Sequence, residues 1–312
     1  MWRIACTSAS GLANLKARST RYCKAPRVML EGRSMSKQQR VWTGWAVVTG
    51  ASSGFGVIFA EQLAKRGLSL LLAGRDEHRL AAVAQRVRVI RPDTKVELIV
   101  GDLGTTSGVD ALVAHIEGWP VDVLVNNAGF GTYGPFAELD AGREQNMVAV
   151  NVDALVRLTH AVLPGMLARG RGGILNVAST IAFQPAPYQA SYGASKAFVL
   201  SFSQALWAET RGSGATVTAL CPGPTRTGFV DALGSDVSHT ATYRRLAAPE
   251  PVVLAGLRAL DRGRPVAIPG LRNRVMASAV RLAPGWVSTL VSGRMLRPTD
   301  ASVGGRRREN TV

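Results

Sequence analysis

The stretch Trp45-Ala-Val-Val-Thr-Gly-Ala-Ser-Ser-Gly-Phe-Gly56 decides the fold of this 312-residue chain. Its first five residues form a short apolar run that predicts a buried strand. The glycines that follow predict a tight turn, and an apolar helical pattern continues over 54–66, where Gly67 ends it. A glycine-rich turn between a strand and a helix brings free backbone N–H groups to one point. This context is typical of a site that binds the phosphates of a dinucleotide.

The same alternation of strand and helix continues along the chain. Further strands are predicted at 68–73, 96–100, 121–125, 173–178, 215–220 and 265–268, and further helices at 76–90, 107–117, 140–168, 190–211 and 249–262. Continuous apolar strands that alternate with helices are typical of a parallel sheet buried on both faces. We therefore predict the α/β class, with a single Rossmann-like, doubly wound parallel sheet and helices on both faces.

Charge divides the chain into three parts. Residues 1–40 carry a net charge of +8 and residues 263–312 a net charge of +7, whereas residues 41–262 carry only +1. A nucleic-acid-binding domain is expected to carry a basic stripe on its folded surface, so we predict no nucleic-acid partner. We expect a disordered basic extension over 1–40, one dinucleotide-binding catalytic domain over 41–270, and a basic amphipathic extension over 271–312.

The end of the second strand bears on the choice of dinucleotide. An NAD site usually places an Asp or Glu here for the ribose 2′-hydroxyl. This chain has Gly74 at about that position, followed by Arg75, whose guanidinium can pair with a 2′-phosphate. We therefore predict NADP (NADPH) rather than NAD. The alternative is that Arg75 is an ordinary exposed arginine at the start of a helix.

Two more strand ends carry polar residues at the predicted ligand-binding edge. Asp102 and Leu103 follow the third strand, and the Asp102 carboxylate can accept from an adenine amino group. Asn127, Ala128 and Gly129 follow the fourth strand, where they can line the ribose and stiffen the rim of the sheet. The alternative for Asn127 is a simple turn residue.

Tyr192 and Lys196 stand four residues apart, and Lys196 is the only lysine after Lys95. On a helix, this spacing places the phenol and the ammonium on one face. A cation beside a phenol lowers the phenol's pKa, so we expect Tyr192 to act as a general acid/base near neutral pH.

Taken in order, these motifs resemble the classical short-chain dehydrogenase/reductase family over about residues 45–270. The resemblance rests on the glycine turn at 49–56, Asn-Asn-Ala-Gly at 126–129, Asn151, Ser179 and the Tyr-x-x-x-Lys motif at 192–196, with Pro222-Gly223 beyond it. The small departures are Ala178, where the family often has Ser, and Phe55, where it often has Ile or Leu. Neither departure bears on the expected chemistry.

The resemblance implies a catalytic tetrad. Ser179 would hydrogen-bond the substrate oxygen, and Tyr192 would donate or remove its proton. Lys196 would bind the nicotinamide ribose and lower the pKa of Tyr192, and Asn151 would hold a water that links Lys196 to solvent. The residues expected to contact the cofactor are Gly50, Ser52, Ser53, Gly54, Phe55, Gly56, Arg75, Asp102, Leu103, Asn127, Ala128, Gly129, Tyr192, Lys196, Pro222, Gly223 and Thr227.

The predicted function is therefore an NADP(H)-dependent oxidoreductase that interconverts a carbonyl and a secondary alcohol. The alternative is an NADP(H)-binding sensor without turnover. Seven aromatic or aliphatic residues near the strand ends or in the loop 224–247 predict a small apolar substrate, although they could instead only pack the loop. These residues are Phe130, Phe183, Tyr188, Phe229, Val230, Leu233 and Tyr243.

The remaining expectations concern partners and location. The segment 271–296 is basic and amphipathic, so it can contact an anionic membrane, although packing on its own domain or on a partner subunit is favoured. The resemblance implies a homodimer or homotetramer through helices 140–168 and 190–211. Unpaired Cys6, Cys23 and Cys221 fit a reducing compartment, scattered histidines predict no metal site, and we expect a cytoplasmic protein. The Arg-rich segment 1–40 resembles a transit peptide in composition, but a disordered extension or a start codon set too early is favoured.

Overall fold

The computed structural model describes Arg40 and residues 42–229, Leu233, Thr240, Tyr243 and 246–298. Its strands are β1 (Trp45–Thr49), β2 (Ser69–Gly74), β3 (Val96–Val100), β4 (Val121–Asn126), β5 (Gly172–Val177), β6 (Ala215–Leu220) and β7 (Val266–Ala267). Its α-helices are α1 (Gly54–Lys65), α2 (Glu77–Ile90), α3 (Thr106–Ile116), α4 (Ala141–Val148), α5 (Ala154–Ala168), α6 (Ala190–Glu209), α7 (Pro249–Asp261), α8 (Leu271–Leu282) and α9 (Gly285–Leu296). The predicted alternation is confirmed, with boundaries that differ by one or two residues.

The seven strands form one parallel sheet in the order β3-β2-β1-β4-β5-β6-β7. The order reverses direction between β1 and β4, so the loops that follow these two strands diverge and leave a crevice. The predicted Rossmann-like fold is therefore confirmed. The crevice lies at the edge where the glycine turn and the Asn-Asn-Ala-Gly motif both end.

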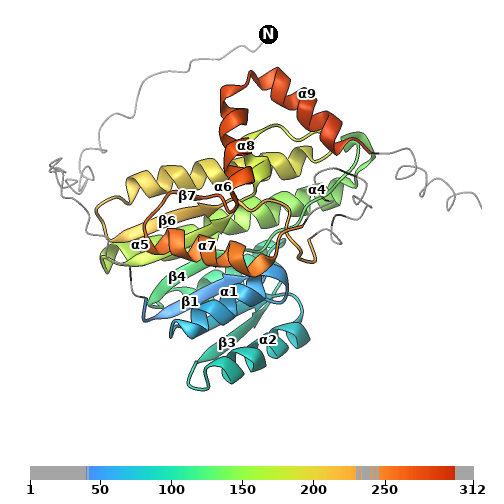
Figure 1. Ribbon diagram of the computed structural model, residues 1–312. Coiled ribbons are helices and arrows are strands. Elements are labelled where there is room, and N and C mark those ends of the chain that lie inside the picture. The colour runs from blue at the N-terminus through green and yellow to red at the C-terminus, as the bar shows by residue number, and fades with distance from the viewer. Residues whose placement is uncertain are drawn as a thin grey trace, which may run out of the picture. The chain divides into compact units, whose positions relative to one another are not determined.

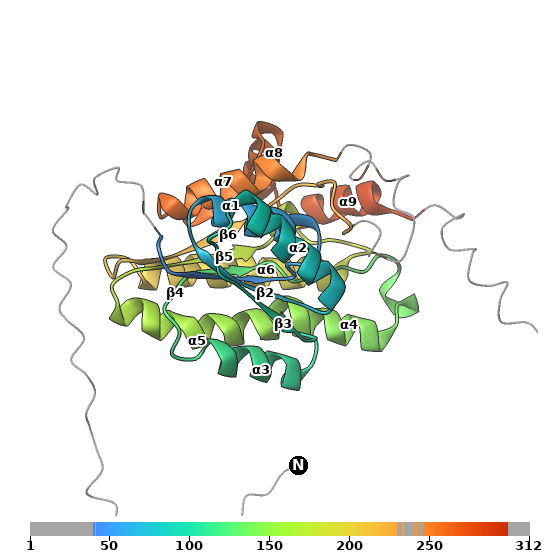
Figure 2. The same cartoon turned by 90° about the horizontal axis from the view of Figure 1, so that it is seen from below.

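Helices cover both faces of the sheet (Figures 1 and 2). On one face α1, α2 and α7 bury apolar side chains such as Phe59, Leu80 and Leu257 against the strands. On the other face α3 and α5 do the same with residues such as Leu112 and Leu158. Because both faces are covered, the strands can be apolar on both sides, which explains their unbroken hydrophobic sequences.

The helix predicted over 140–168 is continuous but contains a turn of π-helix, η2 (Ala149–Asp153), between α4 and α5. Asn151 lies in this turn and is fully buried. Insertions of this kind in an α-helix often mark functional sites because they redirect one side chain. By length and composition the helix Ala141–Ala168 could cross a membrane. Its inner face, however, packs on β4 and β5, as expected for a core helix.

The segment after 270 folds into α8 and α9, which a turn at Ala283 and Pro284 joins. Buried residues on these helices, such as Ala277 and Ser292, face the domain. The Tyr133 hydroxyl donates a hydrogen bond of 2.8 Å to the carbonyl of Leu296 and so fixes the end of α9. The predicted extension 271–312 therefore begins as a part of the folded domain. The extension predicted over 1–40 lies outside the described residues, except for Arg40.

Candidate active site

A cavity of about 1490 Å³ lies at the carboxyl ends of the strands. The loops after β1 to β6 contribute to its walls, and α8 and α9 close one side. It includes the crevice between the loops after β1 and β4. One continuous cavity can therefore hold a dinucleotide and a second molecule at its end.

The glycine turn forms the phosphate-binding end of this cavity. Gly50 and Gly54 have φ angles of +62° and +55°, which side chains with a Cβ atom rarely adopt. The Asn127 amide nitrogen donates to the carbonyls of Thr49 (2.9 Å) and Gly50 (3.1 Å), and so fixes the turn. Among the described side chains, none caps the first turn of α1. The free N–H groups and the positive end of the helix dipole thus face the cavity and suit an anionic ligand.

Gly56 and Thr49 support this turn from behind. A Cβ atom on Gly56 would lie 2.1 Å from the carbonyl oxygen of Gly50, so only glycine lets α1 begin so close to β1. Gly56 therefore allows α1 and β1 to pack closely. It was predicted from the sequence to contact the cofactor, but it does not line the cavity. The Thr49 hydroxyl accepts from the backbone N–H groups of Asn127 and Ala128, both at 3.0 Å.

Two arginines lie at the end of the cavity near β2. Arg75 is exposed at the cavity wall, as predicted, and Arg79 joins it from the first turn of α2. Arg79 forms an ion pair with Asp76, with 3.2 Å between Nε and Oδ2. Gly74 presents only backbone there, and a Cβ atom on it would touch Ser52 and Leu80 at 3.4 Å. The wall is thus basic at the place where an NAD site carries an acid.

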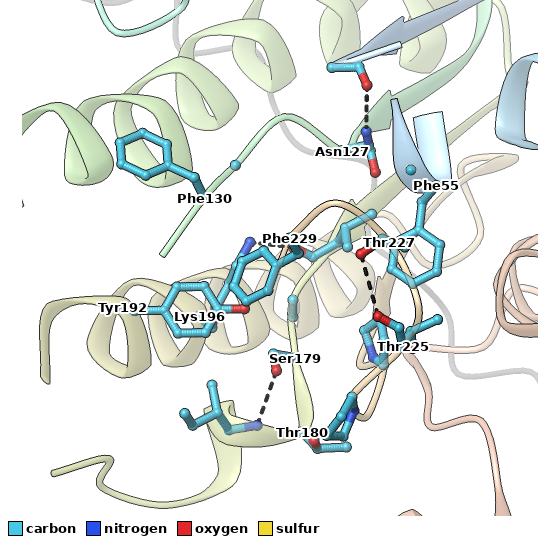
Figure 3. Close-up of a pocket in the computed structure, with 18 of the residues that line it drawn as sticks. Phe55, Asn127, Phe130, Ser179, Thr180, Tyr192, Lys196, Thr225, Thr227 and Phe229 are labelled. Atoms are coloured by element: carbon cyan, nitrogen blue, oxygen red, sulfur yellow. Dashed lines mark hydrogen bonds between the residues drawn. The ribbon is translucent and has the colours of Figure 1, made fainter. Parts of the chain in front are cut away.

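Tyr192 and Lys196 project from α6 into the middle of the cavity (Figure 3). Both are about 95% buried. The Lys196 ammonium lies 5.8 Å from the centroid of the Tyr192 ring and donates a hydrogen bond of 2.9 Å to the carbonyl of Val177. The predicted common face of the two side chains is confirmed.

The expectation of a lowered pKa for Tyr192 is wrong for this geometry. Burial raises the pKa of Tyr192, the phenol of Tyr243 adds to the rise, and a hydrogen bond with Ser179 offsets only a part of it. Burial also lowers the pKa of Lys196 to about 8. Removal of the phenol from water thus outweighs the effect of Ser179, so at neutral pH Tyr192 is a protonated phenol.

Ser179 and Phe229 complete the surroundings of the Tyr192 hydroxyl. Ser179 follows β5 and begins the short 3₁₀-helix η3 (Thr180–Phe183), where its hydroxyl accepts from the N–H of Ile181 at 3.3 Å. The ring of Phe229 packs on the ring of Tyr192, with 5.3 Å between centroids, as Figure 3 shows. The result is a proton donor and a second hydroxyl at an apolar surface.

Asn151 lies behind Gly129 and clamps the chain that passes the site. Its amide accepts from the N–H of Phe130 (3.1 Å) and donates to the carbonyl of Phe130 (3.0 Å) and to the hydroxyl of Ser195 (3.1 Å). A Cβ atom on Gly129 would lie 2.7 Å from this amide oxygen and 3.3 Å from the Lys196 ammonium. Asn151 and Lys196 therefore meet at Gly129. The water-holding role of Asn151 stays a prediction.

Most of the predicted residues meet at the cavity, and the structure adds others. Leu103, Asp102, Ala128, Pro222, Gly223 and Thr227 line it, and Thr227 packs against the glycine turn beside Gly54. Of the residues predicted to form the apolar substrate pocket, four line the cavity: Phe130, Phe183, Phe229 and Tyr243. Tyr188 and Leu233 instead pack nearby with Tyr133. Val230 lies outside the described residues.

The sequence reasoning missed Arg79, Ser195 and the residues that α8 and α9 contribute. The missed cavity residues of these two helices are Arg272, Asn273, Met276, Ala277, Val280, Ser292, Met295 and Leu296. One signal was available for α8: Asn273, Ala277 and Val280 follow at helical spacing, on the face opposite Val275 and Leu282.

The sequence matches the short chain dehydrogenase family over residues 44–238. The chain belongs to this family. A 17-beta-hydroxysteroid dehydrogenase type 3 from Mus musculus is 34% identical over 71% of the chain and 70% of its own length. A very-long-chain 3-oxoacyl-CoA reductase from Anas platyrhynchos is 38% identical over 57% of the chain and 58% of its own length. A short-chain dehydrogenase from Sphingobium yanoikuyae in complex with NADPH shares 34% identity and a TM-score of 0.70, covering 83% of this chain and 99% of its own.

The protein is thus a member of a family of oxidoreductases that use an NAD(P) cofactor, and it spans only 58% of the length of the reductase from Anas platyrhynchos. The site's own geometry fits such a cofactor. The cradle formed by Gly50 and Gly54 has no room for larger residues at these φ angles, and it faces an uncapped helix end. Arg75 and Arg79 lie farther along the same cavity, and Lys196 lies at its centre. These features match the successive phosphates and ribose of a dinucleotide.

Proposed function

We propose that this protein is an NADP(H)-dependent oxidoreductase that interconverts a ketone and a secondary alcohol on a bulky apolar substrate. One observation carries the proposal: the buried Tyr192 phenol, the Ser179 hydroxyl and the buried ammonium of Lys196 line the same cavity, with the ammonium 5.8 Å from the centroid of the Tyr192 ring. Such a group of side chains can bind a carbonyl oxygen and transfer a proton to it. A purely structural core has no use for two hydroxyls and an ammonium at the centre of a cavity.

In the direction of reduction, bound NADPH supplies the hydride that forms the new C–H bond at the carbonyl carbon. Ser179 donates a hydrogen bond to the carbonyl oxygen and orients it. Tyr192 transfers its hydroxyl proton to the same oxygen as the C=O double bond becomes a single bond. Lys196, whose ammonium lies 5.8 Å from the centroid of the Tyr192 ring, would attract the phenolate that remains and would bind the nicotinamide ribose. Solvent then returns the proton to Tyr192, and oxidation of the alcohol runs through the same steps in reverse.

The preference for NADP rests on the basic wall after β2. Arg75 is exposed, and the residue before it, where an NAD site usually has an Asp or Glu, is Gly74. Arg79 is close enough in sequence, one helical turn on, to reach the same phosphate. The similarity to a dehydrogenase crystallised with NADPH supports this choice.

The substrate class rests on the lining of the cavity beyond Tyr192. Phe183, Phe229, Met276 and Met295 come from four different segments and give this end an apolar surface. Methionine side chains adapt to ligands of irregular shape. The similar proteins are named for a hydroxysteroid and for a very-long-chain 3-oxoacyl-CoA, which supports a large, largely apolar ketone in place of the small apolar substrate expected from the sequence.

The test is a panel of steroid, 3-oxoacyl and bulky aromatic ketones with NADPH, followed at 340 nm. We expect turnover with at least one of them. Tyr192→Phe removes only a hydroxyl, so it should bind NADPH as wild type does and lower turnover by at least about 10²-fold. Tyr243→Phe, a matched loss of a hydroxyl at the same cavity, should keep turnover within a few-fold. NADPH binding without turnover on any ketone would favour a sensor and overturn the proposal.

A further inference from the structure

Helices α8 and α9 each have two contrasting faces. Asn273, Ala277 and Val280 of α8 face the cavity or the domain, as do Ser292 and Met295 of α9. The opposite face of α8 carries Leu271, Val275 and Leu282, which follow at helical spacing on one stripe. The opposite face of α9 carries Trp286, Leu290 and Val291.

These outer faces are unusually exposed for apolar side chains. Leu282 is 89% exposed, Trp286 70% and Leu290 58%. Among the described residues, fourteen large hydrophobic side chains are exposed, and α8 and α9 contribute seven of them, all on the outer faces except Met276, which lines the cavity. These residues lie within 26 consecutive positions, Leu271–Leu296. Exposed apolar side chains that are scattered singly over a surface are normal, whereas a cluster of them indicates an interaction surface. We call the outer faces of these two helices the α8–α9 surface.

The α8–α9 surface is also positively charged. Arg274, Arg294 and Arg297 are exposed on it or beside it, whereas the exposed Arg272 lies on the cavity side of α8. The sequence contains no Asp or Glu between Asp261 and Asp300. Apolar residues, a tryptophan and arginines without acidic partners are the composition of helices that lie in the interface of an anionic membrane.

We propose that the α8–α9 surface docks on the surface of an anionic lipid bilayer. In a symmetric dimer through this surface, two sets of like-charged arginines would face each other, which disfavours a second copy as the occupant. Phospholipid headgroups with negative charge complement the arginines, and the acyl region accepts Leu282, Trp286 and Leu290. Figure 1 shows α8 and α9 together at the margin of the molecule, far from α2 and β3.

Docking in this way would place the cavity next to lipid. The inner faces of the same two helices line the cavity, so one pair of helices would separate it from the bilayer. The binding proposal itself does not depend on the proposed function. It concerns the outer faces of α8 and α9, which hold no residue of the catalytic group.

The test is co-flotation of the full-length protein with vesicles. We expect binding to vesicles of phosphatidylcholine that contain about 30% phosphatidylserine, a content that gives the vesicle a negative surface potential. Binding should be at least about tenfold weaker to vesicles of phosphatidylcholine alone. It should be weakened to the same degree when the anionic vesicles are in about 0.5 M salt, which screens the surface charge. The triple variant Leu282→Ser, Trp286→Ser, Leu290→Ser should weaken binding to the anionic vesicles at least tenfold. Arg274→Gln with Arg294→Gln should weaken it by about fivefold per arginine, from about 1 kcal/mol for each charge.

Two matched controls make the result specific. Val89→Ser removes an equally exposed apolar side chain from α2, and Arg88→Gln removes an exposed arginine from the same helix. Both should bind vesicles as wild type does. If the triple variant also binds as wild type does, binding comes from another part of the chain and the proposal is wrong. If the triple variant instead converts a dimer into a monomer in sedimentation, the surface is an interface between copies, and the proposal is again wrong.

Discussion

At the scale of single residues, Lys196 carries an ammonium group whose burial lowers the stability of the folded protein at neutral pH. Its ammonium is almost fully buried and donates to the carbonyl of Val177, yet burial lowers its pKa from 10.5 to about 8. The unfolded chain therefore binds this proton more tightly than the folded protein does. As pH rises from about 8 to about 10.5, the unfolded state loses its extra proton and the folded state gains relative stability. Below pH 8 the buried charge is a cost.

This cost gives a prediction for Lys196→Met, which keeps an apolar side chain of similar length. The variant loses the bond to Val177 at every pH, but it has no charge to bury. We expect the free energy of unfolding of wild type, minus that of the variant, to rise by up to about 3 kcal/mol between pH 8 and 10.5. Urea unfolding at several pH values measures the difference. A difference that stays constant over this range would show that the pKa of Lys196 is not lowered.

The proposed preference for NADP depends on the single charge of Arg75. We expect Arg75→Ala to weaken NADPH binding about ten- to hundredfold, because charge-assisted hydrogen bonds of this kind contribute roughly 1.5–3 kcal/mol. NADH binding should change little, since NADH has no 2′-phosphate. Arg79→Ala should weaken NADPH binding less, because Arg79 already pairs with Asp76. Fluorescence titration measures each affinity, with Arg88→Ala on the same helix as the control. Equal losses for NADPH and NADH would contradict the assignment.

At the scale of elements, two long helices carry the site and also present exposed faces. On α6 the inner face holds Tyr192 and Lys196, whereas Ala194, Phe198 and Ser201 are exposed on the outer face. Phe198 stacks on Phe202, with 5.7 Å between ring centroids. Small residues around an exposed aromatic pair suit close packing of a second helix.

We therefore expect a homodimer or homotetramer in which α6 of one copy packs on another copy, together with α4 and α5. Phe198→Glu places a charge in this contact and should shift the protein towards monomer at micromolar concentration. Val89→Glu, at an exposed position on α2, should leave the assembly unchanged. Sedimentation velocity of the three proteins distinguishes these outcomes. A wild-type protein that sediments as a monomer would reject the assembly.

At the scale of the whole molecule, most of the net positive charge lies in other parts of the sequence than most of the site residues. The described site is built on a sheet whose surrounding chain, residues 41–262, is almost neutral, and the positive charge lies beyond it. Segments from Gly50 to Leu296 meet at one cavity, so residues more than 200 positions apart form its walls. Parallel topology explains this convergence, because it brings every strand's carboxyl end to the same edge.

The sequence by itself determined the class of fold, the order of elements and the residues proposed for catalysis. Apolar strands, glycine turns and helical spacing are local patterns, and each reports on residues that are neighbours in the chain. Gly50, Gly54, Tyr192 and Lys196 were therefore predicted from such patterns, and Ser179 from the family resemblance, and the structure places all five at the cavity. These patterns imply a parallel sheet, and in a parallel sheet the carboxyl ends of all strands lie at the same edge.

Only the tertiary structure decided how these groups interact. The pKa of Tyr192 depends on how completely other segments exclude water from it, and no local pattern reports that burial. The π-helical turn at Asn151 depends on a clamp to Phe130, a residue 21 positions away. The role of α8 and α9 as a wall of the cavity likewise depends on packing at long range, such as the bond from Tyr133 to Leu296. Burial and long-range contacts arise from the folded chain as a whole, so the sequence pattern alone could not supply them.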